Sequence, residues 1–200
     1  MQKKNKPLLF DPFTTRENNQ KLLKQKAIVV WLTGLSGSGK TTLANALQHF
    51  LLQNGHITKL IDGDELRSTL NKDLNYTQQH RTENIRRAAE VAKLFLDSGV
   101  ITCCAFITPT EELRTLSKTI IGENDYVEIY VKCSLEECEK RDVKGLYKKA
   151  RKGDLINFTG INAPFEVPEH PALVVETQHQ TIQECLTQIY DLVRLRISVK

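Results

Sequence analysis

The sequence has no long apolar run. None of its stretches approaches the roughly 20 consecutive apolar residues of a membrane-spanning helix, and no apolar signal core follows the lysines near the N-terminus. A large excess of one charge is also missing, because the net charge is only +4, which gives no argument for nucleic acid as a partner. We therefore expect a cytoplasmic protein with neither a membrane nor a nucleic acid partner. Anionic small substrates are compatible with its mild positive charge.

Metal-binding and redox patterns are missing as well. The five cysteines are odd in number and lack the paired spacing of zinc ligands. Cys103 and Cys104 are adjacent in a predicted strand, so their side chains are expected on opposite faces of a sheet. We interpret all five cysteines as small core residues. The five histidines are scattered, and none is paired as a catalytic base or as a metal ligand.

What the sequence does have is one glycine-rich loop, GLSGSGKTT at residues 34–42. It fits G-x-x-x-x-G-K-[ST], the Walker A phosphate-binding loop. An apolar, mostly β-branched strand at 27–33 precedes it and a helical pattern over 42–52 follows, which is the context that this motif requires. Glycines let backbone N–H groups turn toward phosphate oxygens, and the helix N-terminus faces the same anion. Lys40 adds a mobile cation, and the Thr41 hydroxyl is the candidate ligand for Mg²⁺. The predicted ATP-binding residues of the loop are Gly34, Leu35, Ser36, Gly37, Ser38, Gly39, Lys40, Thr41 and Thr42.

Five apolar strands alternate with helical segments along the chain. Strands are predicted at 27–33, 56–61, 100–107, 126–131 and 172–176, and further helices at 62–70, 82–98, 111–121, 135–142 and 181–195. This alternation predicts a three-layer α/β domain in which helices flank a five-stranded parallel sheet. We expect residues 1–25 to form an N-terminal arm packed on a single domain at 26–200. Residues 143–171 are basic, irregular and rich in glycine and proline, as is typical of a lid, and are called the lid segment below.

Two aspartates, Asp62 and Asp64, follow the second strand, at the sheet edge where such folds bind ligands. Capping of the next helix explains only one of them. Phosphoryl transfer to an alcohol needs a carboxylate that orients the hydroxyl and accepts its proton. We favour Asp64 for this role over capping alone. For Asp62 we expect either a contact with metal-bound water or a structural role.

Basic and aromatic residues surround this position. Arg67 lies one helical turn after Asp64, and Arg81 follows a loop that carries Tyr76. Arginine forks bind phosphate or sulfate oxygens in pairs and aromatic rings stack on bases, so one interpretation is a site for a second, nucleotide-like anion. The other interpretation is a solvated basic face. The lid segment adds a run of lysines from Lys144 onward, and Phe158 gives a cap an aromatic surface to fold against.

Together these motifs resemble the adenylylsulfate kinase (APS kinase) family, the P-loop kinases of sulfate assimilation. The segments that carry the resemblance are GLSGSGKTT, DGDELRSTLNKDLNYT at 62–77, RTENIRRAAEVAKLF at 81–95, AFITP at 105–109, and KGLYKKAR with FTGINAPFEVPEHP within 144–171. In this order and spacing they cover nearly the whole chain. The resemblance implies a P-loop kinase fold like that of the nucleoside-monophosphate kinases. It also implies transfer of the ATP γ-phosphate to the 3′-hydroxyl of adenosine 5′-phosphosulfate (adenylyl sulfate), with Mg²⁺, by a cytoplasmic homodimer.

The resemblance also assigns roles to single residues. Asp64 becomes the catalytic carboxylate, and Lys40 binds the ATP phosphates. The expected contacts of adenylyl sulfate are Asp64, Arg67, Tyr76, Arg81, Asn84, Ile107, Lys144 and Phe158, and those of the ATP adenine are Arg141 and Thr177. Thr108 stands where the family has a serine described as a phosphoenzyme residue. Its hydroxyl leaves that role open, but direct in-line transfer does not require it, and we favour direct transfer.

The chain departs from the family pattern at some positions. Tyr76 stands where the family usually has phenylalanine, and His80 stands where it usually has aspartate. Two alternative functions stay open at this point. One is a related P-loop kinase for another small molecule or nucleotide, and the other is a P-loop regulator that binds ATP without transferring phosphate.

Overall fold

The computed structural model describes residues 15–198. Five parallel strands form one sheet in the order β2-β3-β1-β4-β5. The strands are β1 (Val29–Thr33), β2 (Thr58–Asp62), β3 (Ile101–Ala105), β4 (Tyr126–Lys132) and β5 (Leu173–Glu176). The predicted parallel sheet is therefore confirmed, and each strand begins and ends within two residues of its predicted bounds.

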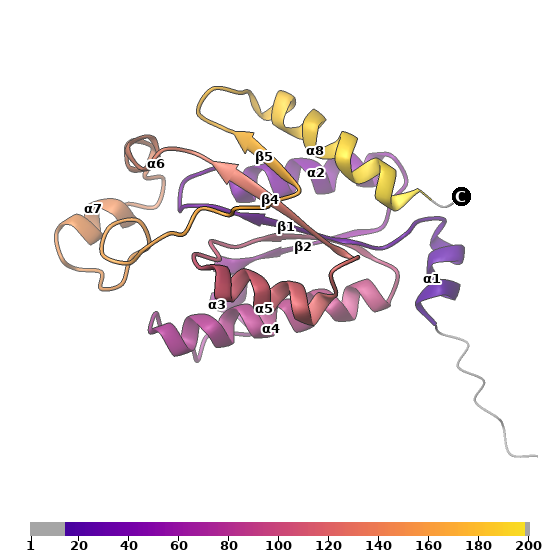
Figure 1. Cartoon of the computed structure of the whole chain (residues 1–200), viewed down its shortest axis with the longest axis horizontal. Helices are drawn as coiled ribbons and strands as arrows, with labels where there is room; N and C mark the ends of the chain where they lie inside the picture. The colour runs from indigo at the N-terminus through magenta and orange to yellow at the C-terminus, as the bar shows by residue number, and fades with distance from the viewer. Residues whose placement is uncertain (1–14, 199–200) are drawn as a thin grey trace, which may run out of the picture.

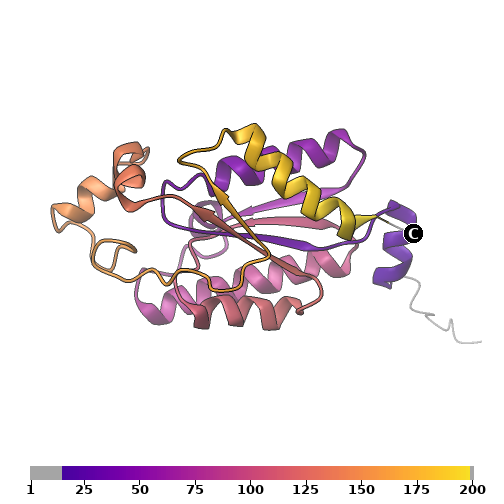
Figure 2. The same ribbon diagram turned by 45° about the horizontal axis from the view of Figure 1, so that its top comes forward.

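Long helices cover both faces of this sheet (Figures 1 and 2). One face carries α2 (Lys40–Gln53) and α8 (Ile182–Ile197), and the other carries α4 (Gln78–Asp97) and α5 (Glu111–Ile121). Side chains alternate between the faces along each strand, so the core has two halves. Cys103 lies in the half beneath α2 and α8 and Cys104 in the other, as predicted. All five cysteines are free and buried.

Three short helices lie around the carboxyl ends of the strands. They are α3 (Gly63–Ser68), α6 (Leu135–Arg141) and α7 (Leu146–Arg151). Helices α6 and α7 extend beyond the sheet, on the left of Figure 1, at the end toward which the strand arrows point. The lid segment thus begins beside the edge where ligands of such sheets bind.

The structure corrects the predicted boundaries of α4 and α3 and adds a helix in the lid segment. Helix α4 begins at Gln78 rather than at residue 82, because the Thr77 hydroxyl caps it by accepting the N–H of His80. Helix α3 ends at Ser68, earlier than the predicted residue 70. Helix α7 lies inside the lid segment, which had been expected to be irregular; the carboxylate of Asp142 accepts two N–H groups of its first turn at 3.0 Å each.

The described part of the predicted arm forms a helix, α1 (Arg16–Leu23), which the sequence analysis did not predict. The Arg16 guanidinium binds both carboxylate oxygens of Asp125 at 2.6 Å and the carbonyl of Ala27 at 2.8 Å. These contacts fix α1 to the amino-terminal side of the sheet, away from the lid segment (Figure 1). The first 14 residues of the predicted arm lie outside the described residues. Within residues 15–198 no helix is both long and apolar enough to cross a membrane.

Candidate active site

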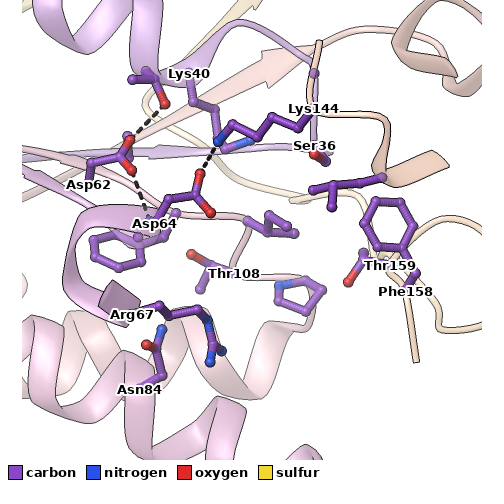
Figure 3. A pocket seen from close by; sticks show the side chains of 18 of the residues that line it. Ser36, Lys40, Asp62, Asp64, Arg67, Asn84, Thr108, Lys144, Phe158 and Thr159 are labelled. Carbon is purple, nitrogen blue, oxygen red and sulfur yellow. Dashed lines mark hydrogen bonds and ion pairs between the residues drawn. The ribbon is translucent and has the colours of Figure 1, made fainter. Parts of the chain in front are cut away.

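A cavity of about 380 Å³ lies at the carboxyl ends of the strands (Figure 3). Its walls come from the phosphate loop after β1, from the ends of β2 and β3, from α3 and α4, and from the lid segment. The predicted site residues that line it are Ser36, Gly37, Gly39, Lys40, Thr41, Thr42, Asp64, Arg67, Tyr76, Arg81, Asn84, Ile107, Thr108, Lys144 and Phe158. Those that do not line it are Gly34, Leu35, Ser38, Arg141 and Thr177.

Glycine is required at two points of the phosphate loop. Gly34 has φ +152°, and a Cβ there would lie 2.5 Å from the carbonyl oxygen of Val131. Gly37 has φ +77°, and its Cβ would lie 3.1 Å from the carbonyl oxygen of Cys138. A side chain at either position would push the loop off β4 and α6. The loop ends at Gly39, where α2 begins without a side-chain cap, so its first N–H groups are available to an anion.

Lys40 extends from the first turn of α2 to the floor of the cavity. Its ammonium group donates to the carbonyl oxygen of Leu35 at 2.6 Å, and the side chain is only 8% exposed. Burial lowers the pKa of Lys40 to about 8, even though the charges of Asp62 and Asp64 act in the opposite direction. A phosphate group entering the loop would supply the opposite charge that this buried cation lacks.

The structure separates the two aspartates. Asp62 is the N-cap of α3, since one of its carboxylate oxygens accepts the N–H of Asp64 at 2.9 Å. Its other oxygen accepts the Thr41 hydroxyl at 2.7 Å. The Asp64 carboxylate has no capping role and projects into the cavity, where it forms an ion pair with Lys144 of the lid segment (Figure 3). Capping therefore accounts for Asp62 and leaves Asp64 for chemistry.

Two arginines and an aromatic ring form the opposite half of the cavity. The guanidinium of Arg67 lies over the ring of Tyr76, 4.5 Å from its centre. Arg81 donates from Nε to the carbonyl of Tyr76 at 3.1 Å and from Nη1 to the hydroxyl of Thr159 at 2.8 Å. Burial lowers the pKa of both arginines, and the charge of Arg67 lowers that of Arg81 further. Within residues 15–198 neither arginine forms an ion pair, so this half of the cavity favours an anion.

The lid segment is tied to the phosphate loop through Tyr147 of α7. Its hydroxyl donates to the carbonyl oxygen of Ser36 at 2.8 Å. The ring of Phe158 packs edge-on against Tyr147, with their centres 5.0 Å apart, and lines the cavity. Lid and loop therefore enclose one space, whose aromatic lining includes Phe158 and Tyr76 together with Phe106 and Tyr147.

Arg141 and Thr177 lie behind the phosphate loop rather than in the cavity. Arg141 donates to the carbonyl of Thr177 at 2.8 Å and to that of Gly37 at 3.4 Å. The Thr177 hydroxyl donates to the carbonyl of Ser38 at 2.7 Å. Both residues thus contact the loop directly, and their role toward the adenine of ATP stays a prediction.

Thr108 has an unusual environment for a phosphate acceptor. It is 1% exposed, has φ +42°, and its hydroxyl accepts the indole N–H of Trp31 at 2.9 Å. Its carbonyl accepts from the buried guanidinium of Arg114, which also donates to the carbonyl of Glu166 at 2.8 Å. Sequence reasoning missed Arg114 because nothing in its spacing distinguishes it from a surface arginine on α5. It missed Thr159, the partner of Arg81, although this residue lies within the FTGINAP motif.

Phosphate loops hold nucleoside triphosphates in many classes of protein. Here the cavity continues from the loop to the carboxylate of Asp64 and then to Arg67 and Arg81, which form no ion pair among the described residues. This leaves room for an acceptor molecule beside the phosphate. Switch proteins have no use for such a second half, whereas an enzyme that phosphorylates a small anionic molecule needs it. The fold and the site therefore define a P-loop kinase.

Comparison with known proteins narrows this class. The family model for adenylylsulphate kinase matches residues 26–176. The adenylyl-sulfate kinase of Bacteroides thetaiotaomicron is 51% identical over 192 residues, which cover 96% of this chain and 96% of that protein. The chain belongs to the adenylylsulphate kinase family.

Solved structures agree with this assignment. The APS kinase of Mycobacterium tuberculosis in complex with AMPPNP and APS superposes with a TM-score of 0.82 at 38% identity, covering 84% of this chain and 98% of that one. The hexameric APS kinase of Thiobacillus denitrificans has a TM-score of 0.65 at 30% identity, covering 86% of this chain and 29% of that one. The protein is thus an enzyme, a kinase with the APS kinase fold.

Proposed function

We propose that the protein transfers the γ-phosphate of ATP to the 3′-hydroxyl of adenylyl sulfate, giving ADP and 3′-phosphoadenylyl sulfate. The observation that carries this proposal is the position of Asp64, between the phosphate loop with Lys40 and the half of the cavity that contains Arg67 (Figure 3). The names of the relatives support the same acceptor, and the M. tuberculosis structure contains AMPPNP and APS together.

In the proposed reaction Asp64 is the general base. Its carboxylate hydrogen-bonds the 3′-hydroxyl and takes its proton while the oxygen attacks the γ-phosphorus in line with the departing ADP oxygen. Lys40 and the backbone N–H groups of residues 34–42 hold the phosphates and stabilise the charge that develops on the transferred group. The ammonium of Lys144 is bound to Asp64 in the structure, so in this proposal it moves to an anionic oxygen when the substrates enter. This direct route gives the buried hydroxyl of Thr108 no covalent role.

The acceptor half holds adenylyl sulfate through charge and stacking. Arg67 and Arg81 bind the phosphosulfate oxygens, because they are the unpaired cations of this wall. Tyr76 and Phe158 hold the adenine between their rings. Asn84 and Ile107 complete the wall around the nucleoside.

The oxygen groups near the phosphate loop fit Mg²⁺. The Thr41 hydroxyl and the Asp62 carboxylate lie 2.7 Å apart at the cavity wall, and Mg²⁺ prefers oxygen donors. Among residues 15–198 no group of three or more histidine, cysteine or acidic side chains could hold a metal ion. We propose Thr41 as its protein ligand, with Asp62 acting through water. When bound, the ion neutralises charge on the phosphate oxygens.

The remaining features follow from the same proposal. We propose one kinase domain over residues 26–200, with an arm at 1–25 and a lid at 143–171, which works in the cytoplasm as a homodimer. One relative, the APS kinase of T. denitrificans, is described as hexameric, which supports an assembled state but not the number of subunits. Light scattering coupled to gel filtration measures the state of this chain; a monomeric mass would contradict the dimer.

Turnover tests the function directly. ADP release is measured with ATP, Mg²⁺ and adenylyl sulfate, and the product is identified by mass spectrometry as 3′-phosphoadenylyl sulfate. Parallel reactions replace adenylyl sulfate with AMP or gluconate. We expect ADP release that depends on adenylyl sulfate. Equal rates with either substitute acceptor, or no acceptor-dependent ADP at all, would contradict the proposal.

A further inference from the structure

One residue that the proposed mechanism does not use controls the loop that carries Tyr76 (residues 69–77). The ring nitrogen Nδ1 of His80 accepts the backbone N–H of Asn75 at 2.9 Å. The same short stretch is held by the two substrate arginines, because Arg67 donates to the carbonyl of Asn75 and Arg81 to that of Tyr76, each at 3.1 Å. The backbone on both sides of the aromatic residue is thus anchored from α3 and α4.

The contact from His80 differs chemically from the other two. The arginine contacts use permanently charged donors, whereas Nδ1 can accept a hydrogen bond only while the imidazole is neutral and carries its proton on Nε2. A second proton would turn Nδ1 into a donor that faces the N–H donor of Asn75. The bond would then be lost, and the N–H group would have to find another acceptor.

We propose that His80 is a positioning residue for adenylyl sulfate, which sets the Tyr76 ring through the Asn75 N–H bond and releases the Tyr76 loop when its imidazole is protonated. The inference rests on the proposed function, since it assumes that Tyr76 contacts the acceptor. It concerns the acceptor half of the site, because His80 holds the residue next to Tyr76, and the Tyr76 side chain lines that half of the cavity. Protonation therefore weakens acceptor binding and leaves nucleotide binding unchanged.

Two carboxylates on the elements around His80 keep their charge over the relevant pH range. The charged groups of the neighbouring elements are Asp64, Glu65 and Arg67 on α3, Lys72 and Asp73 on the loop, and Arg81, Glu83, Arg86 and Arg87 in the first turns of α4. Hydrogen bonds from Arg87 lower the pKa of Asp73. Hydrogen bonds from Arg86 and Arg87 lower the pKa of Glu83 to about 2. Both carboxylates therefore remain ionised above pH 5.

The direction of the pH effect on the KM follows from the protonation form of His80 that accepts the Asn75 N–H. The neutral ring holds the loop, so the KM for adenylyl sulfate is lowest where the imidazole is neutral and rises when the imidazole takes up a second proton. One neutral hydrogen bond corresponds to about a two- to tenfold change in affinity. We expect the KM for adenylyl sulfate to rise by that factor between about pH 7.5 and pH 5.5, with the KM for ATP unchanged.

Two substitutions distinguish the effect of the hydrogen-bond acceptor from the effect of its protonation. In His80→Asn the amide oxygen is attached to Cγ, as Nδ1 is in histidine, so it can accept the Asn75 N–H without titrating. In His80→Ala the acceptor is absent. Steady-state kinetics for both substrates are measured from about pH 5.5 to 8 for the wild type and both variants. Nitrogen NMR of the imidazole ring reports, without turnover, whether Nδ1 accepts a hydrogen bond.

We expect His80→Asn to keep the wild-type KM of neutral pH and to lose the additional rise in acid. His80→Ala should show the raised KM for adenylyl sulfate at every pH. Three results would overturn the inference: the same acid dependence in wild type and His80→Asn, an unchanged KM in His80→Ala, or an NMR signal of a protonated Nδ1 at neutral pH. Wild-type turnover at pH 7.5 in the same experiment tests the proposed function separately.

Discussion

The buried lysine of the phosphate loop makes nucleotide binding depend on pH in a calculable way. Burial lowers the pKa of Lys40 to about 8, so the unliganded enzyme carries this charge on roughly 90% of molecules at pH 7, half at pH 8 and 10% at pH 9. A bound phosphate favours the ammonium form and returns its pKa toward the ordinary value near 10.4. Nucleotide binding is therefore accompanied by the uptake of a fraction of a proton, and this fraction increases as the pH rises.

The magnitude follows from the same fractions. Binding of ADP should take up about 0.1 proton at pH 7, about 0.5 at pH 8 and about 0.9 at pH 9. The dissociation constant should rise about tenfold between pH 7 and pH 9, because the protonated form that binds becomes scarce; this corresponds to about 1.4 kcal/mol. ADP is preferred to ATP as the ligand because no transfer can occur.

Calorimetry in two buffers of different ionisation enthalpy measures the proton uptake at each pH. The matched control is Lys40→Met, which keeps a long unbranched side chain but has no titrating group. Its uptake should be flat from pH 7 to pH 9, and its affinity lower throughout. Equal uptake by wild type and Lys40→Met, or uptake in the wild type that does not increase with pH, would refute the reasoning from burial of Lys40.

Three further predictions concern single side chains. Asp64→Asn should lower kcat by about 10²- to 10⁴-fold and leave ADP affinity unchanged, and an unaltered kcat would remove Asp64 from the role of base. Arg67→Ala should raise the KM for adenylyl sulfate about tenfold or more with little effect on that for ATP, since a charge-assisted hydrogen bond is lost; equal effects on both substrates would argue against this contact. Arg114→Met should lower the melting temperature by about 4–10 °C, because about 2–3 kcal/mol is lost when the partly buried carboxylate of Glu128 and the carbonyl of Glu166 lose their partner. Glu128→Gln in the Arg114→Met background should recover part of this loss, and no recovery would show that Glu128 is not the source.

The sequence predicted best what depends on local signals. The bounds of α5, Glu111–Ile121, agree with the prediction because Thr110 caps its start and Gly122 follows its end. The meeting of the phosphate loop with Asp64 and Thr108 was predictable too, since the carboxyl ends of parallel strands share one edge. These predictions need only hydrophobic periodicity, helix caps and sheet topology.

Contacts between segments that are distant in the chain could not be predicted from the sequence. The bond from Trp31 to Thr108, which buries the hydroxyl expected at the phosphoenzyme position, joins residues far apart in the chain. The same holds for Arg114, whose guanidinium links the end of β3 to Glu166 at the far end of the lid segment. In other proteins arginine and threonine side chains are commonly exposed on the surface. Here the packing of β3, α5 and the lid segment buries Thr108 and Arg114 instead.

Arg81 shows how such contacts serve the site as a whole. A guanidinium has five N–H donors, and the three hydrogen bonds to Tyr76, Thr159 and Asn157 use one donor on each of its nitrogens. Two donors therefore remain for an anion among the described residues. Arg81 can hold the Tyr76 loop and the lid segment in place while it binds an oxygen of the acceptor, so the arrangement does not have to be broken when adenylyl sulfate enters. A site prepared in this way loses less conformational entropy on binding than one whose loop and lid must be ordered by the substrate.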